Sequence, residues 1–137
     1  MILTLDIGNT NIKSALFDGK EMVHYWRLST DITATSDEYG IRLMSFFRHV
    51  GLTEDCVEGI IISSVVPTIN FTIDHMCQNY FHMTPMFVAP GVKTGINIRY
   101  ENPRELGSDR IANAVAAFDE YGGEKPVIFI DFGTATT

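Results

Sequence analysis

The chain has 137 residues, of which 45% are hydrophobic and 20% charged, so it can bury a core of its own. Its formal net charge of -7, without a cluster of Lys or Arg, argues against a protein that binds nucleic acid or acidic membrane surfaces. The first residues lack the features of a signal peptide, and no apolar run approaches the about 18 residues of a membrane span, so we expect a cytoplasmic protein. Cys56 and Cys77 show no metal-ligand spacing and are predicted to be reduced structural thiols.

The first 14 residues contain a turn between two predicted strands that suits a phosphate group. The first strand, over 2–6, delivers Asp6 to the turn, and the second is expected over 11–17. Gly8 lets backbone N–H groups approach an anion, and Asp6 requires a cation between itself and a phosphate. Side-chain donors follow at Asn9, Thr10 and Asn11. The alternative is an ordinary β-hairpin in which Gly8 and Asn9 merely supply positive φ.

The next elements alternate between strands and helices. A third strand is expected over 22–28, which completes an antiparallel meander. A helix over 36–49, a buried strand over 59–66, a helix over 67–81 and a short strand over 86–88 follow. This order is that of a ribonuclease-H-like α/β domain with a mixed sheet, which we place over residues 1–120.

Residues 100–118 are predicted to be a loop that leads into a helix. Ser108 or Asp109 can cap this helix. Its buried face is expected at Ile111, Ala114, Val115 and Phe118. The Asp109 carboxylate could accept a proton from a substrate hydroxyl, and the Arg110 guanidinium could bind a substrate carboxylate in a fork. The alternative is that Asp109 is only an N-cap and Arg110 only part of a solvated ion pair.

The motif of the first turn recurs at residues 126–137. An apolar strand is predicted over 126–131, ending at Asp131, and small residues follow at Gly133, Thr134 and Ala135. Two such loops that face each other can clamp a polyphosphate and its metal ion, which favours nucleotide binding over the simple hairpin. We therefore assign residues 121–137 to the beginning of a second, similar domain, which further polypeptide or a partner must complete.

Three motifs in this order make the chain resemble the type III pantothenate kinases, which belong to the sugar kinase, Hsp70 and actin superfamily. They are 6–11 (DIGNTN), 102–113 (NPRELGSDRIAN) and 131–136 (DFGTAT), and the segment 61–67 also looks like the family's. The middle motif is the specific one, because the other two fit any member of the superfamily.

The resemblance implies a role for each motif. The ATP phosphates are assigned to Asp6, Gly8, Asn9, Thr10, Asn11 and Lys13, and on the second loop to Gly133, Thr134 and Ala135. Pantothenate is assigned to Tyr100, Gly107, Ser108, Asp109 and Arg110, with Asp109 as the proton acceptor. Asp131 is assigned to a monovalent cation, potassium or ammonium, and Asp6 to magnesium, directly or through water.

The implied reaction converts ATP and pantothenate to ADP and 4'-phosphopantothenate, the first step of coenzyme A biosynthesis, in a homodimer. Relatives are expected to be longer, so this chain alone is expected to lack the adenosine contacts and a further pantothenate contact. The alternative function is that of a non-catalytic homologue acting as a transcriptional accessory factor. A kinase for another substrate, such as a sugar or acetate, is a third hypothesis, although such kinases lack the 102–113 segment.

Overall fold

The computed structural model describes residues 1–102, 105–122 and 126–131. It divides into two compact units, Met1–Phe87 and Val88–Thr137, and each unit is described by itself.

The first unit opens with an antiparallel meander, as predicted. Its strands are β1 (Ile2–Ile7), β2 (Asn11–Asp18) and β3 (Glu21–Ser29). Residues in β1 alternate between buried and partly buried, so one face of the strand packs into the core and the opposite face is partly exposed. The core face carries Leu3, Leu5 and Ile7, and the opposite face therefore carries Thr4 and Asp6.

Helices and strands then alternate. The elements are α1 (Ser36–His49), η1 (Glu54–Cys56), β4 (Gly59–Ser64), η2 (Pro67–Ile69), α2 (Asn70–Phe81) and β5 (Met86–Phe87). Helix α1 begins where the sequence predicts, because Thr35 forms a capping box with Glu38. The helix expected from Pro67 starts with a short 3-10 turn, and its regular part begins at Asn70.

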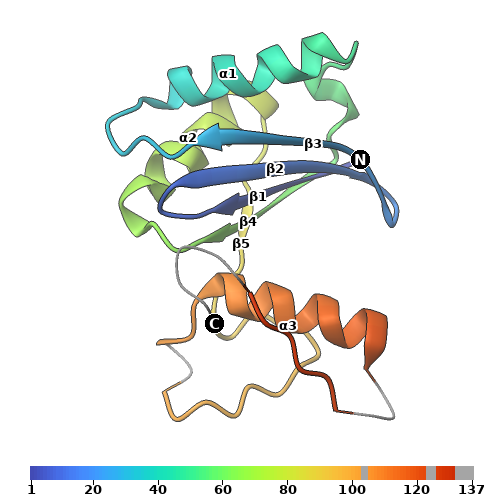
Figure 1. Cartoon of the computed structure of the whole chain (residues 1–137). Coiled ribbons are helices and arrows are strands. Elements are labelled where there is room, and N and C mark those ends of the chain that lie inside the picture. The colour runs from blue at the N-terminus through green and yellow to red at the C-terminus, as the bar shows by residue number, and fades with distance from the viewer. Residues whose placement is uncertain (103–104, 123–125, 132–137) are drawn as a thin grey trace. The chain divides into compact units, whose positions relative to one another are not determined.

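The five strands form one mixed sheet in the order β3-β2-β1-β4-β5. Strand β1 lies at the centre, antiparallel to β2 and parallel to β4, and β5 is parallel to β4. Helix α1 connects β3 to β4, and helix α2 connects β4 to β5, so both connections lead toward the β5 edge of the sheet. Both helices lie on one face of the sheet (Figure 1). This is the α/β arrangement of a ribonuclease-H-like domain, so the predicted fold class is confirmed.

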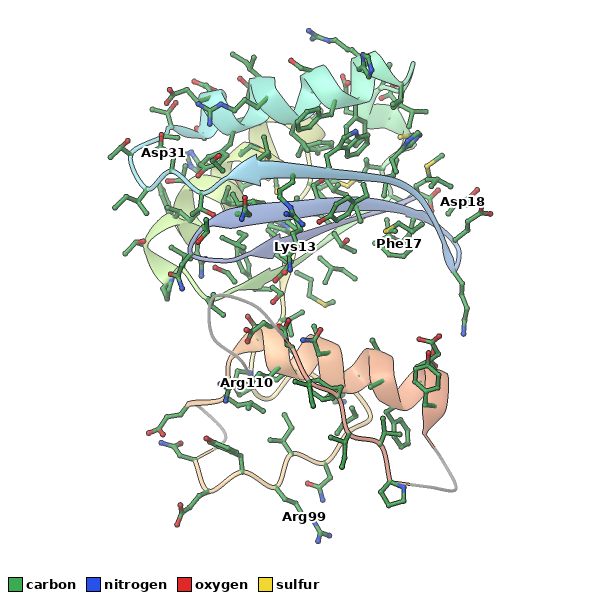
Figure 2. The ribbon with its side chains drawn as sticks, in the orientation of Figure 1. Lys13, Phe17, Asp18, Asp31, Arg99 and Arg110 are labelled. Atoms are coloured by element: carbon green, nitrogen blue, oxygen red, sulfur yellow. The ribbon has the colours of Figure 1, made fainter. Side chains whose placement is uncertain are left out.

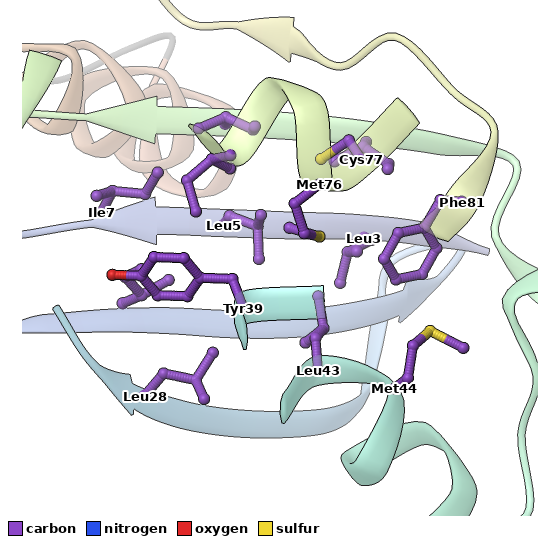
Figure 3. Packing of buried hydrophobic residues seen from close by; sticks show 14 of the residues in the cluster. Leu3, Leu5, Ile7, Leu28, Tyr39, Leu43, Met44, Met76, Cys77 and Phe81 are labelled. Carbon is purple, nitrogen blue, oxygen red and sulfur yellow. The ribbon is translucent and has the colours of Figure 1, made fainter. Parts of the chain in front are cut away.

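One hydrophobic core joins the two helices to the sheet (Figure 3). Helix α1 contributes Tyr39, Leu43 and Phe47, and helix α2 contributes Met76 and Phe81. The rings of Phe47 and Phe81 meet edge to face, with centroids 5.6 Å apart. Each fully buried Leu, Ile or Phe contributes about 1.5–3 kcal/mol. The core therefore gives the ends of β1 and β2 a rigid support.

The second unit contains the helix α3 (Ser108–Tyr121). Of its predicted buried face, Ile111 is buried, Ala114 and Val115 are partly buried, and Phe118 is exposed, so the prediction for Phe118 was wrong. Residues 118–121, the last turn of α3, are all exposed, so the ring of Phe118 is not covered by neighbouring side chains. Among the described helices, none has the length and apolar character to cross a membrane.

The apolar run at 126–131 is not a strand, which corrects the prediction for this segment. A strand is defined by hydrogen bonds to a neighbour, and no described strand pairs with these residues. Ile128 is 88% exposed, so the side chains that suggested a buried strand lie open to solvent.

Candidate functional site

The loop between β1 and β2 spans residues 8–10 and is closed by a backbone hydrogen bond; we call it the phosphate loop, after the role predicted for it. The Gly8 N–H donates to the carbonyl of Asn11 over 3.0 Å. A Cβ at Gly8 would lie 3.2 Å from that same oxygen, so a side chain fits there poorly. Neither Gly8 nor Asn9 has a positive φ. The alternative, in which these two residues merely supply positive φ to a hairpin, is therefore wrong. Asn9 and Thr10 are exposed, which leaves the loop accessible to a ligand.

Asp6 and Lys13 flank the phosphate loop on adjacent strands. They are directly paired in the β1–β2 register, and Lys13 Nζ lies 3.3 Å from Asp6 Oδ2. Their side chains are 44% and 49% exposed, so both charges can reach a ligand. Lys13 projects from β2 in Figure 2. A carboxylate and an ammonium side by side suit a phosphate group that carries a cation.

The end of β4 lies against the end of β1. Ser63 is paired with Asp6, and the Val65 N–H donates to the carbonyl of Ile7 over 3.0 Å. Ligands of open α/β sheets bind at the carboxyl ends of parallel strands. The phosphate loop leaves β1 at this end of the sheet, next to the end of β4.

Thr30, which the sequence analysis did not single out, holds the phosphate loop from the end of β3. Its hydroxyl donates to the carbonyl of Gly8 over 2.6 Å, and its N–H donates to the carbonyl of Thr10 over 3.0 Å. A signal for it exists, because in a meander the residue after the third strand lies beside the first residues of the second strand.

The predicted substrate residues lie in the second unit, around the start of α3. Gly107 occupies the N-cap position, so the prediction that Ser108 or Asp109 is the cap was wrong. The Asp109 carboxylate instead accepts the backbone N–H of Arg110 over 2.8 Å. Arg110 is exposed at the first turn of α3 (Figure 2), and Tyr100 is 49% exposed.

The loop before α3 is held by a local pair. The Glu105 N–H donates to the carbonyl of Asn102 over 3.0 Å, and Asn102 Nδ2 donates to Glu105 Oε1 over 2.6 Å. Asp131 is partly buried, whereas the predicted ATP contacts Gly133, Thr134 and Ala135 lie outside the described residues.

The structure thus brings the predicted residues together in two groups. Asp6, Lys13 and the phosphate loop form one group in the first unit, and Gly107 to Arg110 form the other in the second unit. In the described part of the chain, no three His, Cys, Asp or Glu side chains cluster as a ready metal site. Cys56 and Cys77 are free thiols, and burial raises the pKa of Cys77 to about 12.

The sheet order and the loop after β1 define an α/β domain of the actin-like ATPase class. The family model for type III pantothenate kinase matches residues 2–137, and the chain belongs to this family.

Similar proteins agree with this result. Proteins named type III pantothenate kinase from Halalkalibacterium halodurans, Exiguobacterium and Brevibacillus brevis are 52%, 54% and 55% identical to it over 137 residues. Each match covers 100% of this chain and 53% of the relative. The chain therefore spans about half the length of the curated relatives that it matches.

Proposed function

We propose that this chain supplies the phosphate loop and the acceptor-substrate residues of an enzyme that transfers the γ-phosphoryl group of ATP to pantothenate. The products are ADP and 4'-phosphopantothenate, and the reaction is the first step of coenzyme A biosynthesis. The observation that carries the proposal is the family match over residues 2–137, combined with Asp6, Lys13, Asp109 and Arg110 at the positions described above. None of the relatives named above supports a non-catalytic accessory factor.

The phosphate loop suits the donor side of this reaction. Phosphoryl transfer needs alignment and neutralisation of charge more than covalent chemistry. Lys13 supplies a positive charge beside Gly8, Asn9, Thr10 and Asn11, and the exposed side chains of Asn9 and Thr10 can donate to phosphate oxygens. We assign Gly133, Thr134 and Ala135 to the same nucleotide.

Asp109 suits the acceptor side. Its carboxylate is oriented by the Arg110 N–H and only partly buried, so a substrate hydroxyl can approach it. In this proposal Asp109 accepts the proton of the pantothenate hydroxyl that attacks the phosphorus. Arg110, exposed beside it, binds the pantothenate carboxylate as a bidentate donor. Tyr100, Gly107 and Ser108 complete this group.

Two cations complete the proposal. Asp6 fits magnesium because its carboxylate is 44% exposed and only one protein carboxylate is needed when phosphates and water fill the other positions. Asp131, a partly buried carboxylate, is assigned to potassium or ammonium. The bound cations neutralise charge that develops on the transferred phosphoryl group. We further propose that the enzyme is a cytoplasmic homodimer.

An ADP-release assay on the complete product of the gene encoding this sequence tests the proposal. We expect release that depends on pantothenate, and a loss of about 100-fold or more in Asp109→Asn, the range for removal of a general base. Asp119→Asn, on the exposed second half of the same helix, is the matched control and should retain activity. Pantothenate-independent release by the unmodified enzyme would contradict the proposal. Equal turnover in folded Asp109→Asn would remove Asp109 from the role of base.

A further inference from the structure

The phosphate loop is held through its carbonyl groups by one residue. Thr30 Oγ1 donates to Gly8 O over 2.6 Å, and Thr30 N donates to Thr10 O over 3.0 Å. Both bonds reach into a loop that spans only residues 8–10, between the end of β1 and the start of β2. Thr30 thus fixes the loop at both of its ends.

The direction of these bonds matters for an anion. A peptide unit is planar and trans, so its C=O and its N–H point in opposite directions. Because the carbonyl of Gly8 points at Thr30, the N–H of Asn9 points away from it, on the exposed side of the loop. Anions are bound by N–H groups and repelled by carbonyl oxygens. The Thr30 hydroxyl therefore sets the peptide between Gly8 and Asn9 in the orientation that a phosphate needs.

Thr30 is itself held by the core. The next residue, Asp31, donates its N–H to Tyr39 Oη over 2.8 Å, and Tyr39 Oη donates to the Asp31 carbonyl over 2.8 Å. Tyr39 is 1% exposed and belongs to α1.

We propose that Thr30 is a positioning residue for the ATP phosphates, acting through the carbonyls of Gly8 and Thr10 and supported by Tyr39. This inference rests on the proposed function, because it assigns the phosphate loop to ATP. A loop held in its binding conformation before the ligand arrives loses less freedom on binding. The hydroxyl of Thr30 should therefore affect nucleotide binding without contacting the nucleotide.

Three variants separate this role from a general effect on folding. Thr30→Val keeps the shape of the side chain and the backbone N–H but removes the hydroxyl donor. Thr30→Ser restores the donor. Thr33→Val is the matched control, because it makes the same chemical change three residues later, where the hydroxyl donates to Asp31 and not to the phosphate loop. All three are made in the complete product of the gene, with steady-state kinetics, melting temperature and binding of magnesium-ATP by calorimetry.

We expect Thr30→Val to raise the KM and Kd for ATP about fivefold to tenfold, the effect of one lost hydrogen bond, with the KM for pantothenate within about twofold of the unmodified enzyme. Thr30→Ser and Thr33→Val should bind ATP as the unmodified enzyme does. Unchanged ATP constants in Thr30→Val would overturn the inference. So would a lower melting temperature with equal increases in both KM values, because that is the signature of a purely structural residue.

Failure of the proposed function is distinguishable from failure of the positioning role of Thr30. If the unmodified protein binds ATP but does not phosphorylate pantothenate, the proposed function fails, and weaker ATP binding by Thr30→Val still supports the positioning role. If the unmodified protein is active and Thr30→Val binds ATP equally well, the positioning role alone fails. An unmodified protein that neither binds nor consumes ATP overturns both.

Discussion

Asp6 and Lys13 are cross-strand neighbours whose charged atoms lie 3.3 Å apart beside the phosphate loop, and both are about half exposed. An ion pair this exposed contributes only about 0–1 kcal/mol to folding. Asp6→Asn should therefore keep the melting temperature within a few degrees while lowering phosphoryl transfer by about 100-fold, because the proposed magnesium ion would lose its carboxylate ligand. Asp18→Asn, at the far end of β2 (Figure 2), is the control and should be fully active. An active Asp6→Asn enzyme would show that Asp6 has only a structural role in the sheet.

The monovalent cation is testable through Asp131, which is partly buried. We expect activity in potassium or ammonium to exceed activity in sodium at equal ionic strength, and Asp131→Ala to abolish that difference, because the carboxylate is the proposed ligand. The measurement is the rate of ADP release in each salt. Full activity of the unmodified enzyme in sodium alone would count against this assignment.

Helices α1 and α2 cross where the ring of Tyr80 lies on Gly40. A Cβ at Gly40 would lie 2.4 Å from Tyr80 Cδ2, so Gly40→Ala should lower the free energy of unfolding by about 1–3 kcal/mol, as overpacking does. In a Tyr80→Ala background the same change should instead raise it by about 0.5–1 kcal/mol, because alanine is the better helix former. Urea unfolding of the four proteins measures both effects. Equal effects in the two backgrounds would show that the ring is not the cause.

Ser14 is a fully buried residue of β2 whose hydroxyl has no hydrogen-bond partner within the described residues. An unpaired buried hydroxyl costs about 1–3 kcal/mol. Ser14→Ala should therefore raise the free energy of unfolding by about 1 kcal/mol. Ser29→Ala, an exposed position on β3, should change it by less than about 0.5 kcal/mol. A destabilised Ser14→Ala protein would indicate that the hydroxyl has a partner after all.

The capping box of α1 predicts a pH dependence. Hydrogen bonds from the backbone N–H and the hydroxyl of Thr35, over 2.8 and 3.0 Å, hold the pKa of Glu38 below its ordinary value of 4.5. A carboxyl with a lowered pKa stabilises the fold fully above its ordinary value, and this stabilisation is lost as the pH falls through the lowered value. Glu38→Gln can still form the capping box but does not titrate.

The stability difference between the unmodified protein and Glu38→Gln should therefore shrink between pH 7 and pH 3. Unfolding by urea at several pH values measures it. A difference that stays constant over this range would exclude a contribution from ionised Glu38.

Local patterns were sufficient to predict the strands and the two long helices of the first unit. The apolar run over 2–6 predicted β1, and the structure buries Leu3, Leu5 and Ile7 of that strand. Gly8 and the polar residues after it located the turn, and the helix predicted over 36–49 has the start that the structure gives α1. A strand, a turn and a helix start each depend on residues that are close together in the chain, so local sequence is enough to predict them.

Features that depend on distant partners were harder to predict. The apolar run 126–131 has the composition of a strand, but a strand also needs a paired backbone, which composition does not reveal. Thr30 resembles any threonine after a strand until the register of β2 and β3 is known. For the cap of α3, Ser108 and Asp109 were favoured by type, yet the helix begins one residue earlier and Gly107 takes that position.

The central position of β1 has a consequence for how the protein folds. Ile2 pairs with Phe17 on one side and with Gly59 on the other, so β1 has one partner that is near in sequence and one that is far. Contacts between distant residues close large loops and form slowly. We therefore expect the hairpin that carries the phosphate loop to form early, with β4 adding later during synthesis. Strand β1 would then complete its hydrogen bonds only when β4, more than 50 residues later in the chain, docks against it.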